Sequence, residues 1–254
     1  MRNGYWMLSA NGTVYPFGDA PHLADVRTAI SQRRGDVAAH LESTPTGAGY
    51  WILDSQGRVY VIGDATRIGG LPAGTLQPLE TARTLRRTPT GHGYWIITTT
   101  GRVFPFGDAH RYGSAPAALR AHIIDAVVTP LGHGYWLFGA GGGVLAFGDA
   151  HLYGTAAGRM DGHSVTGAVS SADGHGYLVV NTVGKVLTFG DAVNRGSVVH
   201  TPHGISGVSP DGNGYLMVDV AGLVNAFGDN AAVGSLAGHA PASPIISISA
   251  QPPE

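Results

Sequence analysis

Several features are scarce in this 254-residue sequence, and each scarcity excludes a class of protein. Cysteine is absent, which excludes disulfide frameworks, thiol catalysis, cysteine zinc sites and iron–sulfur clusters. Charged residues make up 13%, and 15 basic against 17 acidic residues leave a net charge of −2, so we expect no nucleic-acid partner. No run of about 18 apolar residues occurs, and we therefore expect no membrane span.

Enzyme and targeting signals are scarce as well. The sequence has no GxSxG, HExxH or P-loop motif. It has only three glutamates, so a glycosidase pair of carboxylates would have to use aspartate. We expect no cofactor and no bound metal. The first residues lack the apolar run of a signal peptide. Because the first repeat starts at residue 4, we expect either a trimmed domain or a removed leader.

Glycine, by contrast, is abundant, with 40 residues, and it marks turns within a sixfold repeat. Each copy reads GY, then three apolar or aromatic residues, a turn glycine, a short apolar run and finally FGDA or a close variant. The copies begin at Gly4, Gly49, Gly93, Gly134, Gly176 and Gly214. The mean spacing is (214 − 4)/5 = 42 residues, within the roughly 40–45 residues of a propeller blade.

Each copy predicts four short strands. GYW and the run that ends at FGD form a hairpin, the segment after Gly-Asp-Ala forms a third strand, and the residues before the next GY form a fourth. Residues 244–250 resemble the strand before each GY, so we expect them to pair with the first repeat and close a ring. The sequence therefore predicts a single all-β domain, 1–254, with the fold of a six-bladed β-propeller. For residues 25–34 we expect a helical turn or an extended loop.

The GYW, the turn glycine, FGDA and the trailing Gly-Ser together resemble a repeat of actinobacterial secreted and surface-associated proteins, which often accompanies a separate hydrolase or peptidase domain. The resemblance covers the whole chain and implies an extracellular or cell-surface location. It marks an architecture rather than a reaction. The copies depart from the pattern in places: Leu178 and Leu216 replace tryptophan, Ile62 replaces phenylalanine, and Ala24-Asp25 stands where other copies have Gly-Ser or a close variant.

Two polar residue types recur in every copy, and we interpret both as structural. An aspartate after glycine is suited to capping a turn, whereas a ring of metal ligands is the alternative. These aspartates are Asp19, Asp64, Asp108, Asp149, Asp191 and Asp229. A tyrosine in each GY alternates with the following Trp or Leu across the sheet and is expected to pack between blades. These tyrosines are Tyr5, Tyr50, Tyr94, Tyr135, Tyr177 and Tyr215.

Histidine and arginine recur in only some copies and are the candidate ligand-binding residues. His92, His133 and His175 occupy one place before GY, where solvated loop histidines are the alternative to a zinc site. His110 and His151 follow Gly-Asp-Ala in two copies. Arg67 and Arg111 share another place and Arg195 lies one residue on, suited to carboxylate, phosphate or sugar. Further basic positions are Arg58, Arg102 and Lys185, and the cluster Arg83, Arg86 and Arg87.

Three functions fit these observations. The first is a non-catalytic binding module, expected to be a monomer, that recognises cell-envelope carbohydrate through similar clefts between blades. The second is a protein-interaction scaffold that uses the long segments 21–43 and 66–88. The third, which we rank last, is a propeller hydrolase with acids drawn from Asp25, Asp36, Asp54 or Asp125. Clefts lined by aromatic faces would favour the first, a broad apolar patch the second and one deep pocket with a perturbed carboxylate the third.

Overall fold

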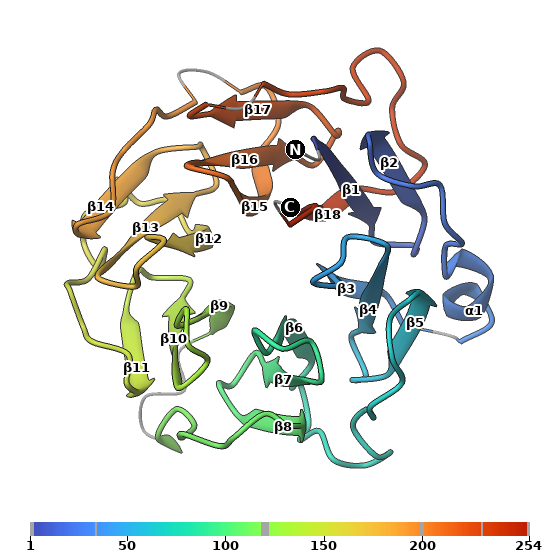
Figure 1. Cartoon of the computed structure of the whole chain (residues 1–254), viewed down its shortest axis with the longest axis horizontal. Helices are drawn as coiled ribbons and strands as arrows, with labels where there is room; N and C mark the ends of the chain where they lie inside the picture. The colour runs from blue at the N-terminus through green and yellow to red at the C-terminus, as the bar shows by residue number, and fades with distance from the viewer. Residues whose placement is uncertain (1–2, 34, 118–121, 199–200, 230, 253–254) are drawn as a thin grey trace.

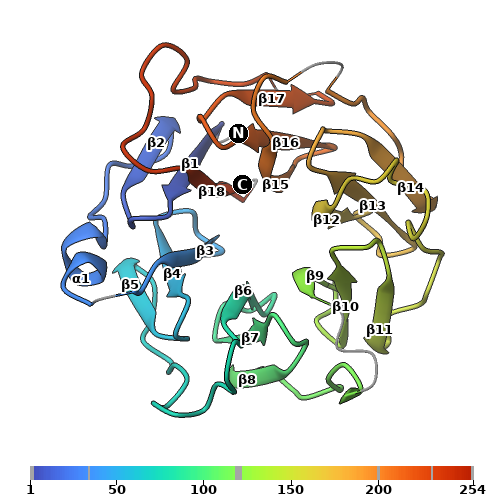
Figure 2. The ribbon, with the colours of Figure 1, turned by 180° about the vertical axis from the view of Figure 1, so that it is seen from behind.

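The computed structural model describes residues 3–33, 35–117, 122–198, 201–229 and 231–252. Six three-stranded antiparallel sheets, one for each repeat, lie around a central axis (Figure 1). The view from behind shows the same ring of sheets (Figure 2). The protein is therefore all-β and propeller-like. Its one α-helix in the described ranges is α1 (Arg27–Ser31), in the stretch for which a helical turn or an extended loop was expected. Across those ranges, no helix is long and apolar enough to cross a membrane.

Every sheet has an inner, a middle and an outer strand, and we number the sheets by repeat. The inner strands are β18 (Ile245–Ala250), β3 (Ala38–Ser43), β6 (Ala82–Arg87), β9 (Ile123–Val128), β12 (Val165–Ser170) and β15 (Ile205–Asp211). The middle strands are β1 (Gly4–Ser9), β4 (Gly49–Asp54), β7 (Gly93–Thr98), β10 (Gly134–Gly139), β13 (Gly176–Asn181) and β16 (Gly214–Asp219). The outer strands are β2 (Val14–Gly18), β5 (Val59–Gly63), β8 (Val103–Gly107), β11 (Val144–Gly148), β14 (Val186–Gly190) and β17 (Val224–Phe227).

The hairpin of middle and outer strands forms where the repeat predicts it. In sheet 2, Gly49 pairs with Gly63 and Leu53 with Val59, so the register spans the GYW and FGD-type motifs. The turn needs glycine because Gly57 has a φ of +83°, which side chains disfavour. The carboxylate of Asp54 accepts hydrogen bonds from two backbone N–H groups of the same turn, at 2.9 Å each. Residues close together in the sequence therefore determine the turn and the register of the hairpin.

The expected fourth strand is absent from the sheets of the described residues, and this corrects the four-stranded blade. The segment after Gly-Asp-Ala makes one backbone hydrogen bond to the turn glycine of its own hairpin, as from Leu71 N to Gly57 O at 2.8 Å. Side chains hold the rest of it. Trp51 Nε1 donates to the carbonyl of Thr66 at 2.9 Å, and Tyr94 of the next sheet donates to the carbonyl of Gly69 at 2.6 Å. The segment therefore runs as irregular chain along the outer edge.

The first sheet combines the two ends of the chain. Its inner strand, β18, pairs antiparallel with β1, with Tyr5 opposite Ala250 and Leu8 opposite Ser247. The remaining sheets take their inner strand from the residues just before the GY of the same repeat. The C-terminal strand thereby fills in sheet 1 the place that β3 fills in sheet 2.

The core consists of aromatic layers between neighbouring sheets. Each of the four tryptophans is at most 1% exposed. Trp51 packs edge-on against Tyr94 of the following sheet, with ring centroids 5.9 Å apart. Three equivalent pairs occur at 5.3, 5.8 and 5.6 Å. The repeat tyrosines and tryptophans thus face opposite neighbours, as strand alternation requires.

Candidate functional site

One end of the ring carries most of the residues singled out above, and we call it the loop face. It consists of the turns that join inner to middle strands (44–48, 88–92, 129–133, 171–175 and 212–213) and the aspartates that follow the outer strands. These elements meet because the middle strand begins where the inner and outer strands end; for example, Tyr50 lies opposite both Ser43 and Ile62.

The aspartates of the repeat hold the turns of their own sheets. Asp64 accepts hydrogen bonds from the hydroxyls of Thr44 and Thr46, and Asp108 accepts them from Thr88 and Thr90. The other sheets vary this contact: Asp149 accepts from Thr129, Asp19 from the backbone of Asn3 and Asp229 from Asn213. Each carboxylate binds locally, so the six do not form a shared ring of ligands.

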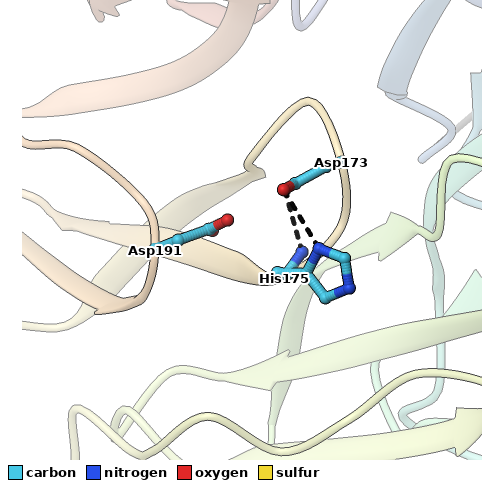
Figure 3. Close-up of side chains that lie close together, drawn as sticks. All are labelled: Asp173, His175 and Asp191. Atoms are coloured by element: carbon cyan, nitrogen blue, oxygen red, sulfur yellow. Dashed lines mark hydrogen bonds and ion pairs between the residues drawn. The ribbon is translucent and has the colours of Figure 1, made fainter.

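Sheet 5 differs because Asp173, a second carboxylate, takes the place that Thr46 has in sheet 2 and Thr90 in sheet 3. Asp173, His175 and Asp191 are exposed and place potential ligand atoms within 4.8 Å of one another, the one such group in the described part of the chain (Figure 3). His175 Nδ1 lies 3.0 Å from Asp173. This contact lowers the pKa of Asp173 and raises the pKa of His175. These three residues could hold a divalent cation, but the ion pair accounts for the proximity of Asp173 and His175, and Asp191 follows the outer strand of the same sheet.

The other predicted ligand residues lie on the same face without converging. His92 and His133 are exposed in the turns of sheets 3 and 4, and they belong to no group of metal ligands among the residues described. Arg67 and Arg111 are exposed as well. Arg195 lines a cavity of about 380 Å³ together with Asp191 and Tyr215. The backbone carbonyls of His110 and His151 accept hydrogen bonds from tryptophan indoles.

The alternative acids of a hydrolase are also dispersed. Asp36 and Asp54 both bind Arg58, at 2.5 and 3.4 Å. Asp125 lies in the axial region and binds Arg86. Asp25 is exposed beside α1, where it accepts a hydrogen bond from the backbone of Arg27. No two of them flank a common cavity in the described residues.

The most distinctive site lies on the axis, at the centre of the loop face. A cavity of about 360 Å³ opens there, and we call it the axial mouth. Its charged residues are Glu42, Arg86 and Arg87. Its walls are mainly apolar and include Pro89, Val127, Val128, Pro130, Val169 and Pro210. Five inner strands or the turns after them contribute, so the site exists only because the sheets meet around the axis.

The charges of the mouth come from neighbouring sheets. Arg86 of β6 donates to Asp125 at 2.7 Å and to the carbonyl of Ala126 at 2.7 Å, and its Nη1 lies 3.3 Å from Glu42 of β3. Burial alone would lower the pKa of Arg86, but the two carboxylates outweigh it and raise that pKa. Arg87 lies farther from its carboxylate, with Nε 3.9 Å from Glu42. Its Nη1 donates to the carbonyl of Thr88 at 3.4 Å, so Nη2 retains donors for a ligand in the part of the chain that the structure describes.

The sequence contained a signal for this site. The inner-strand residues opposite the repeat tyrosines are Ser43, Arg87, Val128, Ser170, Pro210 and Ala250, so Arg87 is the one charged member of the set. Segments 21–43 and 66–88, expected as irregular contact surfaces, end in β3 and β6 and supply Glu42 and Arg87. Sequence alone does not reveal that these residues converge, because they are about 45 positions apart.

The aromatic clefts expected of a lectin-like module do not form from the tryptophans. Trp6, Trp51, Trp95 and Trp136 are sealed between sheets, and their indole N–H groups bind backbone carbonyls. The large exposed apolar side chains are distributed over many turns and do not form a repeated platform. The repeat aromatics therefore serve the core.

No family model and no curated protein matches the sequence. Among solved structures, a chain of the "Crystal Structure of Mitotic Checkpoint Complex" is similar, with a TM-score of 0.44 and 10% identity. The similarity covers 71% of this chain and 58% of that one, so this chain spans little more than half of that chain's length. A likeness at this level assigns neither a family nor an activity.

Proposed function

We propose that the chain is a non-catalytic module that binds a protein partner, and that the axial mouth receives a carboxylate carried by an extended segment of that partner. One observation carries the proposal. Arg87 stands at the edge of a cavity of about 360 Å³, and its nearest carboxylate, Glu42, is shared with Arg86. The guanidinium of Arg87 keeps N–H groups directed at no carboxylate in the described residues.

The chemistry of the cavity suits a peptide. An arginine fork binds a carboxylate with two parallel hydrogen bonds, which fixes the orientation of the ligand. Proline and valine walls suit the aliphatic parts and backbone of an extended chain. The volume lies in the range of about 300–1,000 Å³ that is typical of binding pockets. An acidic side chain or a C-terminal carboxylate would satisfy both parts of the site.

Carbohydrate recognition through repeated clefts has less support, because the tryptophans that would stack on sugar rings are buried. Action outside the cell or at its surface stays a prediction from the resemblance of the repeat. The experiment should nevertheless include a panel of soluble glycans, because peptide binding and carbohydrate binding can be tested with the same purified chain.

The test is selection of a phage-displayed random peptide library against the wild-type chain, followed by affinity measurements with synthetic copies of the enriched peptides. We expect the peptides to share a carboxylate that is required for binding. Arg87→Gln should weaken binding at least about tenfold, since a charge-assisted hydrogen bond contributes about 1.5–3 kcal/mol.

The matched control is Arg111→Gln, which removes an exposed arginine of the loop face outside the mouth. It should leave the affinity unchanged. Enriched peptides without a carboxylate, equal binding by the Arg87→Gln variant, or binding to soluble envelope glycans with no peptide enrichment would each overturn the proposal.

A further inference from the structure

The axial region continues beyond Arg86, away from the mouth, into a second and smaller cavity. Its wall includes His40, Arg83, Arg86, Asp125, Thr166 and Ser247. The free volume is about 20 Å³, which is room for one particle somewhat larger than a water molecule. Arg86 borders both cavities and separates them.

Two side chains in this cavity have unused hydrogen-bonding capacity. The Nδ1 atom of His40 is buried and has no hydrogen-bond partner among the residues described. The Nε atom of Arg83 donates to the carbonyl of Ile124 at 3.0 Å, and this is the only hydrogen bond of that guanidinium to the described residues. Arg83 forms no ion pair with them either.

The remaining polar groups of the wall are already engaged. Asp125 accepts from Arg86 and from the backbone N–H groups of Ala126 and Ala168. Thr166 donates to a backbone carbonyl of the next inner strand, and Ser247 accepts from a backbone N–H. Ser247 still has its hydroxyl proton, so the donors left for a ligand are those of Arg83, Ser247 and His40.

Among the described residues that line the two axial cavities, the charges do not balance. Arg83, Arg86 and Arg87 contribute three positive charges, and Glu42 and Asp125 contribute two negative ones. Burial, followed by the neighbouring arginines Arg86 and Arg83, lowers the pKa of His40 well below its usual value, so this imidazole is neutral near pH 7. Burial also lowers the pKa of Arg83. Arg83 is half-buried, and the charge that offsets it is that of Asp125, which Arg86 already binds. Partial burial of a cation is costly, and an anion in the cavity would lower that cost.

We propose that the cavity between His40 and Arg83 binds one small inorganic anion of the size of chloride. The guanidinium of Arg83 supplies the charge and N–H donors, and the neutral imidazole of His40 supplies a further N–H at Nδ1. The small volume favours a monatomic anion over the larger sulfate and phosphate. This site is separate from the axial mouth and does not depend on a protein partner.

The first test measures chloride binding to the full chain by chlorine NMR, with ionic strength held constant by sodium gluconate. We expect saturable broadening of the chloride signal by a single site, together with a shift of the His40 imidazole resonance. Arg83→Gln should weaken chloride binding at least about tenfold. The matched variant Arg111→Gln, which removes an exposed arginine outside both axial cavities, should bind chloride as the wild type does. Broadening that is absent, or undiminished by Arg83→Gln, would overturn the proposal.

A second measurement requires no variant and therefore does not depend on Arg83→Gln folding correctly. Crystals grown in bromide should give an anomalous peak between the Arg83 guanidinium and His40 Nδ1. Sulfate should not displace it. A crystal with no peak there, or with bromide only at exposed arginines, means that an adventitious ion is all the protein binds.

Discussion

On the two sides of the central axis, different kinds of side chain join each inner strand to the next. We call the inner strands β3, β6 and β9, with Glu42, Arg83, Arg86 and Asp125, the charged arc. There, side-chain charges link each strand to the next: Arg86 reaches β3 and β9, and Asp125 reaches Ala168 of β12. Charged residues thus connect strands whose backbones do not pair with each other.

We call the remaining inner strands, with Thr166, Ser209, Ser247 and Ser249, the hydroxyl arc. Thr166 binds the carbonyl of Ile205, and Ser209 accepts from Ala250 N at 3.0 Å. Ser247 and Ser249 accept from the backbone N–H groups of Leu41 and Ser43. Neutral hydroxyls suffice to join inner strands in this fold. The charges of the other arc therefore have no necessary role in joining the strands, and the two proposed ligand sites use them.

The largest effect is expected from removing the carboxylate of Asp125, which links β9 of the charged arc to its neighbours on both sides. Asp125→Ala leaves Arg86 short of a buried partner and the N–H of Ala168 without an acceptor. The free energy of unfolding should fall by about 3–5 kcal/mol. Ser209→Ala in the hydroxyl arc should cost only about 1 kcal/mol. Urea denaturation measures both, and equal losses would remove the distinction between the arcs.

The next effect concerns acid stability. Glu80 is buried in the loop before β6; burial alone would raise its pKa, but hydrogen bonds, first from Arg102, lower that pKa to about 2. Because the folded pKa lies below the unfolded value of about 4.3, the stabilisation is present above pH 4.3 and is lost as the pH falls towards 2. Its size is on the order of 2–3 kcal/mol. Glu80→Gln should therefore lower stability at pH 7 and flatten its dependence on pH below 4.3.

The control lies at the corresponding hairpin of sheet 5, two sheets farther along the ring. There the neutral Asn181 accepts hydrogen bonds from two backbone N–H groups and donates to Met160. Asn181→Ala should lower stability by a similar amount at every pH. A steep acid dependence that survives Glu80→Gln would show that other carboxylates are responsible.

A smaller effect is expected outside the arcs, where sheets 3 and 4 meet. A Cβ at Gly113 would lie 2.3 Å from the ring of Phe147, so Gly113→Ala should cost about 1–3 kcal/mol. Gly196 faces Phe227 in the same way at 2.4 Å, and Gly196→Ala should cost as much. Thermal unfolding of both variants tests whether the packing around the outer strands is the same in different sheets, although the side-chain contacts of the inner strands differ.

The first two repeats suggest a compensating change. Ala24 takes the place of this glycine, accepting the hydrogen bond of Tyr50, and Ile62 takes the place of the phenylalanine. Adding Phe147→Ile to Gly113→Ala should recover part of the lost stability. A double variant less stable than the sum of the two single changes would contradict this.

The smallest effect is expected for the exposed pair in sheet 5. Asp173→Asn should lower the pKa of His175 towards its ordinary value, because Asp173 is the main cause of its elevation. Stability should not change measurably, since exposed ion pairs contribute little. Imidazole titration by NMR gives the first quantity and urea denaturation the second. An unchanged pKa would show that the pair does not form in solution.

The prediction from sequence was good wherever the information was local. The GYW and FGD motifs located both strands of each hairpin, and the turn glycines marked the residues between them. It failed for the fourth strand. The residues after Gly-Asp-Ala contain apolar side chains, but Tyr and Trp side chains hold them in place of a backbone ladder. Such contacts come from elsewhere in the chain, and no local pattern reports them.

Only part of the candidate site could be predicted from the sequence. Arg83, Arg86 and Arg87 stand out in the sequence as a basic cluster. Their partners Glu42 and Asp125 lie about 40 residues away on either side and carry no motif. Of the candidate histidines and arginines, His175 and Arg195 lie near Asp191 and the others stay apart. Their role in ligand binding stays a prediction.

The sequence by itself determined six repeated hairpins, the alternation of Tyr and Trp between neighbouring sheets and the glycines at the turns. These follow from strand periodicity and backbone stereochemistry, which act within a few residues. Only the tertiary structure decided the axial mouth, the smaller cavity behind Arg86 and the excess positive charge there. Those features depend on inner strands from different repeats meeting at one axis, where burial turns scattered charges into a site.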